Sequence, residues 1–440
     1  MGGYVSLSLL HSCKYGNERD ALKFLQNPKM CNLGEVDSNG RTPLIFACKN
    51  KMTSVALQIL KYPNKCKLGN INYKEWSALM YACENGMKDV ALEILKYPDK
   101  CGFGKTKSSW LGGNELLIAC RQGMSEVALE ILKYPNKYEL SGCCVYATTL
   151  IWACRNNMSQ VAMEILKYAA KYPIYRTDRR GSTALMYACV KGMTNVASEI
   201  LKYHHGRTRT PYLIIACDAG MVDIALEILK YHNRWKLDCV HNGNTALTVA
   251  CRKSMTKVAM KILEHPDRCK LDHVDNNMDT SLTIACSNSM TEVAMKILEH
   301  PDKCKLDHVA NNNTALTLAC SKGMTEVAMK ILEYPYICKL DHIGGYTETA
   351  LTSACAKGMA QVALDILKCP NMCNIDYFDT LGNTALILAC QNNMIEVASA
   401  LLKHSAKTTL SHVNKKGNTA MTFMINNKMD SCIAAINSKE

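Results

Sequence analysis

The chain of 440 residues carries 52 lysine and arginine residues against 39 aspartate and glutamate residues, which gives a formal net charge of +13 at pH 7. No apolar run approaches the ~20 residues of a transmembrane helix and no secretory leader precedes the first predicted helix, so we expect no membrane span and a cytoplasmic protein, with the nucleus as the alternative. The positive charge is spread along the chain, which fits either an anionic partner or a well-solvated surface.

The N-terminal part of the chain, residues 1–41, is predicted to be a capping unit followed by a connector. A helix pair is expected at about residues 7–25, and it exposes more polar groups than later pairs. Ahead of it, residues 1–6 (MGGYVS) match the M-G-x-x-x-[ST] pattern for N-myristoylation of Gly2. A motif this short is most simply read as a chance match, and a single acyl chain would anchor the protein only weakly.

From residue 42 to residue 414, a pattern of two short amphipathic segments recurs, most clearly in residues 314–335 (TALTLACSKGMTEVAMKILEYP). The two segments meet at Gly323, and the apolar residues of each share one face at helical spacing. Helices this short are unstable alone and expose too much apolar surface. Such a unit is stable only when it stacks on copies of itself.

An Ala-Cys dipeptide in the first segment makes the repeat explicit, with a period of about 35 residues. A methionine follows four residues after each of these cysteines. The pattern predicts about 11 clear repeats, with further capping units at both ends, marked by the following cysteines: Cys48, Cys83, Cys120, Cys154, Cys189, Cys217, Cys251, Cys286, Cys320, Cys355 and Cys390.

The array is expected to form one continuous domain that closes with a C-terminal capping repeat at residues 415–440. Threonine or another polar residue opens most first helices, glycine or asparagine separates the two helices, and proline ends many second helices. Between Cys189 and Cys217 the period falls to 28 residues. The shortened connector near residues 203–211 therefore predicts an irregularity that divides the stack into two stretches.

Residues 37–48 (DSNGRTPLIFAC) resemble the ankyrin repeat, whose pattern is a D-x-x-G-x-T-P-L-H hairpin tip, an alanine-rich first helix, a glycine turn and a V-x-x-L-L second helix. The resemblance covers essentially the whole chain. It implies an all-α helix-turn-helix solenoid with short β-hairpin or loop fingers, and a protein-binding function. The Met-x-x-Val-Ala-x-x-Ile-Leu variant is similar to ankyrin proteins expanded in amoeba-infecting giant viruses and some protists, which would place a viral protein in the host cytoplasm.

The sequence departs from the family pattern at the histidine of T-P-L-H. We therefore expect the family's hydrogen-bonded turn network to be absent. The replacing residues are Ile45, Met80, Ile151, Met186, Thr248, Thr283, Thr317 and Thr352.

Candidate chemistry is sparse. No nucleophile motif, phosphate-binding loop or kinase signature occurs, so we expect no enzyme and no cofactor. The 24 cysteines follow the repeat and are interpreted as reduced structural thiols. A recurring motif, His265–Cys269–His273, invites a zinc interpretation, but structural zinc sites use closely spaced cysteine pairs. Packing is favoured, and no metal is predicted.

A binding surface is implied by the resemblance, because ankyrin partners usually meet the concave face made by the fingers and the exposed ends of the first helices. The two residues after each Ala-Cys are carried over to this face, where eight are basic and two acidic. Aromatic and basic finger residues extend it, since tryptophan, tyrosine and arginine are frequent interface anchors. The candidates are Arg41, Lys49, Lys74, Trp76, Trp110, Arg121, Arg155, Arg179, Arg180, Lys191, Arg207, Arg252, Lys253, Lys322, Tyr346 and Lys357.

The sequence thus predicts a non-catalytic protein-interaction scaffold with a basic, partly aromatic concave surface and a protein partner that is acidic. The alternative is that the same face binds nucleic acid or another polyanion by neutralising phosphates. No nucleic-acid motif supports that alternative. A third interpretation, that the lysines and arginines only keep a long array soluble, remains open.

Overall fold

A computed structural model of the chain describes residues 8–102, 114–134, 143–168, 174, 176–203, 211–230, 237–345, 348–404 and 410–437. The chain divides into two units, Met1–Gly206 and Arg207–Glu440. This division falls in the shortened connector near residues 203–211, of which residues 204–210 lie outside the described residues. The domain boundaries inferred from the sequence remain predictions.

The first unit consists of consecutive helix pairs, each with a first and a second helix. Its helices are α1 (Leu9–Lys14), α2 (Glu18–Gln26), α3 (Pro43–Lys49), α4 (Thr53–Leu60), α5 (Ala78–Glu84), α6 (Lys88–Leu95), α7 (Glu115–Arg121), α8 (Ser125–Leu132), α9 (Cys143–Arg155), α10 (Ser159–Leu166), α11 (Ala184–Val190) and α12 (Thr194–Lys202).

The second unit repeats the same plan, and its helix pairs begin at α13. Its α-helices are α13 (Tyr212–Asp218), α14 (Val222–Lys230), α15 (Ala246–Arg252), α16 (Thr256–Leu263), α17 (Ser281–Ser287), α18 (Thr291–Ile297), α19 (Ala315–Ser321), α20 (Thr325–Leu332), α21 (Ala350–Ala356), α22 (Ala360–Leu367), α23 (Ala385–Gln391), α24 (Ile395–His404), α26 (Ala420–Asn426) and α27 (Asp430–Asn437). Two 3-10 turns, η3 (Pro266–Arg268) and η4 (Pro370–Met372), follow α16 and α22.

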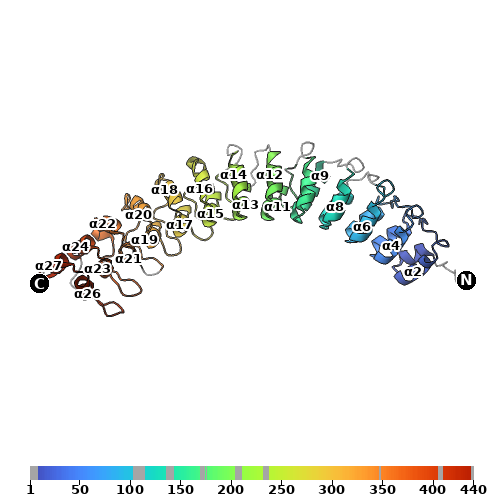
Figure 1. Ribbon diagram of the computed structural model, residues 1–440. Coiled ribbons are helices and arrows are strands. Elements are labelled where there is room, and N and C mark those ends of the chain that lie inside the picture. The colour runs from blue at the N-terminus through green and yellow to red at the C-terminus, as the bar shows by residue number, and fades with distance from the viewer. Residues whose placement is uncertain are drawn as a thin grey trace. The chain divides into compact units, whose positions relative to one another are not determined.

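Within each unit the helices form two layers. First helices pack on first helices, as α3 does on α1 and α5, and second helices pack on second helices, as α4 does on α2 and α6. Figure 1 shows this arrangement repeated along the second unit, with α15, α17, α19 and α21 in one layer and α16, α18, α20 and α22 in the other. The predicted all-α helix-turn-helix architecture is therefore confirmed.

The core lies between the two layers and is built from the residues that recur most regularly in the repeat. In α19 and α20, Ala319, Cys320, Val327 and Ala328 are completely buried. Small residues at the Ala-Cys positions let neighbouring helices approach closely, and a thiol behaves there as a small apolar group. Burial raises the pKa of equivalent thiols, as in Cys355, whose pKa rises to about 12. No described member of the Ala-Cys series forms a disulfide.

The methionine series fills the space where the two helices of a pair meet. Met324 is the N-cap of α20, is 5% exposed, and its backbone N–H donates to the carbonyl oxygen of Ala319 at 2.9 Å. This turn requires a left-handed residue, and Gly323 supplies it with φ of +70°. The gap-filling role expected for these methionines agrees with their burial.

An asparagine just past the C-terminal end of six described first helices ties each of them to the preceding repeat. Asn85 donates its side-chain N–H to the carbonyl oxygens of Cys48 and Lys49, at 2.8 and 3.1 Å. Those carbonyls lie in the last turn of α3, where no donor four residues on continues the helix, although the Cys48 carbonyl oxygen also accepts from the backbone N–H of Lys51 at 3.3 Å. The side chain thus satisfies helix-end groups and fixes the repeat spacing. The same bond to the preceding cysteine is made by Asn50, Asn156, Asn288, Asn392 and Asn427.

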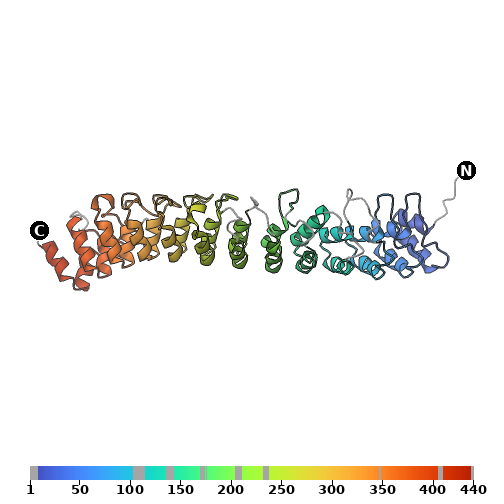
Figure 2. The ribbon, with the colours of Figure 1, turned by 90° about the horizontal axis from the view of Figure 1, so that it is seen from above.

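The connectors form loop fingers rather than β-hairpins with extended strands. In the described residues the finger contacts are isolated β-bridges, such as Ile71 with Ser77 and Phe378 with Thr384. Figure 2 shows the fingers rising on one side of the helices in each unit. A side chain at the base of several fingers reaches back to the previous finger: the Nε2 atoms of His273 and His308 lie 2.9 and 2.7 Å from the carbonyl oxygens of Gly243 and Met278.

The expectation that the turn network is absent is wrong wherever threonine replaces the family's histidine. Thr283 Oγ1 accepts from the backbone N–H of Thr280 at 2.9 Å, while Thr280 Oγ1 accepts from the N–H of Thr283 at 3.2 Å. This reciprocal capping box satisfies helix-start donors from both sides. The threonine hydroxyl is a hydrogen-bond acceptor at the position where the family pattern has histidine. The same box opens α15, α19, α21 and α26.

No helix among the described residues is long and apolar enough to cross a membrane.

Candidate binding surface

The candidate residues that the structure describes lie in the fingers or at the C-terminal ends of the first helices, and these parts make up the candidate surface of each unit. We call it the first-helix surface. Lys49 is the last residue of α3, and other lysines are C-cap residues at the ends of their first helices: Lys191, Lys253, Lys322 and Lys357. All five are exposed. Lysine at a helix C-terminus also interacts favourably with the helix dipole, so part of this pattern has a structural explanation.

Three candidate arginines are engaged in ion pairs inside the chain. Arg41 Nη2 lies 2.7 Å from Asp37 Oδ2 within its own finger. Arg121 pairs with Glu84 of the preceding repeat, and Arg252 pairs with Asp275 in the next finger. Burial alone would raise the pKa of Asp37, but bonds from the side chain and backbone of Arg41 and from the backbone of Asn39 lower it overall. The pairs of Arg121 and Arg252 join adjacent repeats, and all three arginines offer less charge to a partner.

An aromatic column distinguishes the first-helix surface of the first unit. The position two residues before the Ala-Cys cysteine holds an aromatic residue in most of its described repeats, namely Phe46, Tyr81, Trp152 and Tyr187. Each contacts a finger or an arginine. The Arg41 guanidinium lies 4.6 Å from the Phe46 ring centroid, and the Tyr81 ring lies 4.9 Å from that of Trp76. Trp76, a candidate from the sequence, thus packs within its own repeat.

Among the described residues, three basic groups that form no ion pair surround a hollow of about 630 Å³ in the first unit, which we call the Arg155 pocket. α7 and α9 form one part of it and the finger before α11 forms the rest. The Arg155 guanidinium lies 4.7 Å from the ring centroid of Trp152 and 5.9 Å from that of Tyr187. Arg179 and Arg180, both exposed, complete the rim. The structure therefore brings together four of the predicted arginines, since Arg121 lines the same pocket.

One carboxylate faces these arginines, and the finger itself engages it. Asp178 accepts hydrogen bonds from the backbone N–H groups of Arg180 and Ser182, at 2.8 and 2.9 Å, and from the Tyr187 hydroxyl at 2.9 Å. Its burial opposes ionisation, yet these bonds and the charge of Arg155 lower its pKa overall. Asp178 holds the finger in place as an anion and only partly offsets the surrounding positive charge.

The equivalent surface of the second unit is lined by smaller side chains. A hollow of about 440 Å³ is bordered by Ser287, Ser321 and Ser353, with Lys322 and Lys357 at its edge. Glu348 lies there as well and accepts from the Ser353 hydroxyl at 2.8 Å. Serine replaces arginine at the C-terminal ends of α17 and α19. This surface is polar and nearly without aromatic groups among the described residues that line it.

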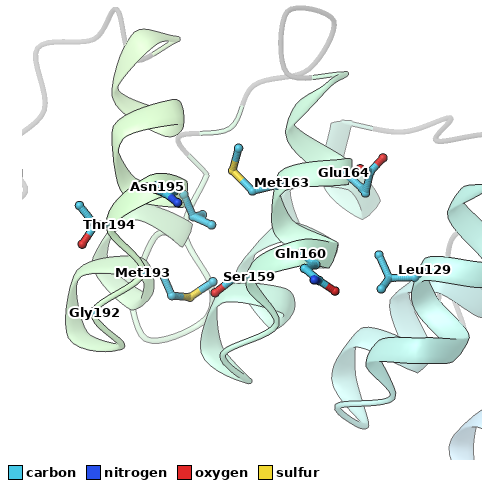
Figure 3. Close-up of a pocket in the computed structure, with 10 residues that line it drawn as sticks. Leu129, Ser159, Gln160, Met163, Glu164, Gly192, Met193, Thr194 and Asn195 are labelled. Atoms are coloured by element: carbon cyan, nitrogen blue, oxygen red, sulfur yellow. The ribbon is translucent and has the colours of Figure 1, made fainter.

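A further hollow of the first unit, of about 690 Å³, lies among the second helices α8, α10 and α12 (Figure 3). Its lining is mixed, with Met163 and Met193 beside Gln160 and Asn195. The one ionisable residue among those that line it is Glu164, whose carboxylate binds Lys167 at 2.7 Å. It presents no basic group to an acidic partner, and it lies away from the first-helix surface.

Three sequence candidates, Trp110, Arg207 and Tyr346, and the proposed acceptor Gly2 lie outside the described residues. Sequence reasoning missed Trp152, Tyr187 and Asp178, although the aromatic column repeats at a fixed distance from the Ala-Cys dipeptide. It also treated the asparagines after that dipeptide as surface, whereas they bind the preceding repeat. Among the described residues no cluster of three or more histidine, cysteine and acidic side chains is arranged to hold a metal ion.

Comparison with known protein families gives extensive matches. The family model described as ankyrin repeats (3 copies) matches residues 9–103, 116–210 and 213–307, and the ankyrin repeat model matches residues 381–415. A search of curated proteins found no matching relative.

Proposed function

Because this chain belongs to the ankyrin repeat family, whose repeats are generally protein-interaction modules, we propose that it is a non-catalytic scaffold that binds an acidic protein partner through its first-helix surface. The observation that carries the proposal is the recurrence of exposed lysines at the ends of the first helices, from Lys49 to Lys357. Regularly spaced positive charge favours a partner with acidic groups over an extended length.

The stack supports this function by being rigid before the partner arrives. Asparagine bridges such as that of Asn85, and finger contacts such as that of His308, join consecutive repeats through hydrogen bonds. A surface held in this way loses little conformational entropy on docking, so more of the contact energy appears as affinity. A cytoplasmic location is part of the same proposal.

The test compares two variants that lose the same charge. In the first, Lys49, Lys191, Lys253, Lys322 and Lys357 are replaced by glutamine. In the control, five exposed lysines at the ends of second helices are replaced by glutamine: Lys61, Lys96, Lys133, Lys167 and Lys202. Each purified protein captures partners from a nuclease-treated, reducing extract, and candidate partners are then titrated as purified proteins.

We expect a defined acidic protein that binds the wild type and the control and binds the first variant at least tenfold more weakly. Equal weakening in both variants would contradict the assignment to the first-helix surface. Binding that disappears on nuclease treatment would favour the alternative, in which nucleic acid is the ligand.

A further inference from the structure

We propose that the Arg155 pocket is a specific docking site for a peptide segment in which an aspartate or glutamate lies beside a large apolar side chain. This inference rests on the proposed protein-binding function and assigns a partner chemistry to one place on the first-helix surface. It follows from the charge of the rim, the apolar floor and the fixed position of one guanidinium.

The charge around the pocket is unbalanced. Arg155, Arg179 and Arg180 form no ion pair within the part of the chain that the structure describes. Arg121, at the far side, is paired with Glu84. Asp178 is the one carboxylate among the residues that line the pocket, and three donors already engage it. Three guanidinium groups without an ion pair and one hydrogen-bonded carboxylate give the pocket a net positive charge, which favours an anionic ligand.

The floor of the pocket is apolar. Ile151 is 3% exposed, and Leu117 and Trp152 are half-buried beside it. An apolar ligand side chain placed here would remove both its own surface and that of Leu117 and Trp152 from water. The volume of about 630 Å³ is enough for a few side chains and is too small for a folded element.

Arg155 is positioned for carboxylate recognition before a ligand binds. Its guanidinium lies beside the rings of Trp152 and Tyr187, which come from neighbouring repeats. Stacking covers the faces of a guanidinium and leaves its N–H edge, which is the part that binds a carboxylate bidentately. Tyr187 is in turn fixed by its hydroxyl bond to Asp178. The aromatic column therefore acts as a support for the arginine.

The same geometry argues against a nucleic acid as the occupant. Single-stranded nucleic acids bind proteins by stacking bases on open aromatic faces. In this pocket Arg155 already lies over the Trp152 ring. The carboxylate of Asp178 also repels a phosphate backbone, whereas a peptide can place a single acidic group on Arg155 and avoid Asp178. An acidic, apolar peptide segment is the ligand that fits both features.

The test is a selection from a random twelve-residue peptide library against the full-length chain, followed by affinity measurement with the enriched peptide. We expect enrichment of aspartate or glutamate next to leucine, isoleucine, phenylalanine or methionine. Replacement of that acid by its amide should weaken binding about tenfold. Arg155→Gln should weaken it about tenfold or more, Arg155→Lys by less, and Trp152→Phe by less than Trp152→Ala.

Lys322→Gln in the second unit is the matched control, and it should change the affinity less than twofold. Circular dichroism and urea unfolding of each variant show whether the stack is intact, and Trp152→Phe keeps the test usable if Trp152→Ala disrupts it. Peptides without an acid, equal affinity in Arg155→Gln, or equal competition by a single-stranded oligonucleotide would each overturn the inference. If Arg155→Gln leaves capture of the acidic protein partner unchanged, the pocket is excluded while the first-helix surface stands.

Discussion

The two units use the same repeat but begin their first helices differently. In the first unit, Ser77 and Thr183 accept from the backbone of Met80 and Met186, residues that cannot return a side-chain bond. In the second unit, Thr245, Thr280, Thr314, Thr349 and Thr419 each form a reciprocal capping box with a threonine three residues later. Thr384 of the second unit, which is followed by Ile387, is an exception.

The first-helix surfaces of the two units differ in their aromatic residues. The position that holds Phe46, Tyr81, Trp152 and Tyr187 in the first unit holds aliphatic or small residues in α13 to α23, for example Val249, Ile284 and Ser353. The second unit thus has regular threonine capping boxes at its helix starts. The first unit instead carries aromatic groups that position arginine side chains. One backbone plan supports either a uniform stack or a specific pocket.

The largest expected effect comes from raising the pH, which acts on a feature that the two units share, the column of buried thiols. Burial raises the pKa of Cys189 in the first unit and of Cys251 and Cys286 in the second to about 12. In the unfolded chain the pKa of a cysteine thiol is near 9.0. Because the folded pKa is the higher one, this contribution to stability is complete below pH 9 and is lost as pH rises towards 12.

We therefore expect the free energy of unfolding to fall as the pH rises from about 9 towards 12, by up to about 1.4 kcal/mol per pH unit for each thiol that ionises in the unfolded chain. Urea titrations in the presence of a reductant measure it, and recovery on return to pH 7 controls for oxidation. A stability that does not change over this range would contradict the burial of the column in solution.

A second experiment exchanges the helix-start chemistry between the units. Thr283→Val keeps the shape of the side chain and removes its oxygen, which leaves the backbone N–H of Thr280 without its acceptor, while the carbonyl oxygen of Thr280 keeps its bond from the N–H of Ile284. The expected cost is about 1–3 kcal/mol. At Met186 in the first unit, threonine should be more stable than valine, because the new hydroxyl can return a bond to Thr183. Urea midpoints of all three variants decide this. A cost for Thr283→Val below about 0.3 kcal/mol would show that the capping boxes add nothing.

The smallest expected effect concerns the fingers. His308→Ala removes the bond from its Nε2 to the carbonyl oxygen of Met278, and Asn70→Ala removes the equivalent bond to Gly40 in the first unit. Because these groups are partly exposed, we expect a loss of less than about 1 kcal/mol in either case. Hydrogen exchange should nevertheless become faster in the finger that lost its contact. Unchanged exchange in both variants would mean that the fingers are held by their own turns.

Much of the architecture was predictable because each repeat encodes it locally. The Ala-Cys dipeptide, the methionine four residues later and the closing proline define helix faces, the turn and the helix end without reference to the rest of the chain. The role of Thr283 was misinterpreted because only the loss of the family's histidine was considered. The ability of the threonine hydroxyl to accept from the backbone N–H of Thr280 was not considered.

The candidate surface was only partly predictable. The arginines of the Arg155 pocket were all identified from the sequence, but Trp152, Tyr187 and Asp178 were not. Neither were the pairs Arg121–Glu84 and Arg252–Asp275, which join residues 37 and 23 positions apart. Such pairs depend on how far one repeat is rotated and shifted on the next, and no local pattern gives that register.

The sequence by itself determined the repeat, the helix pairs, the buried thiol and methionine series and the basic character of the chain, since these follow from periodicity and composition. The tertiary structure decided which charged residues remain unpaired, which aromatic rings support them and which asparagines are used up in joining repeats. The physical reason is that the groups around a charged side chain decide whether it is paired. In a stacked protein many of those groups belong to the adjacent repeat.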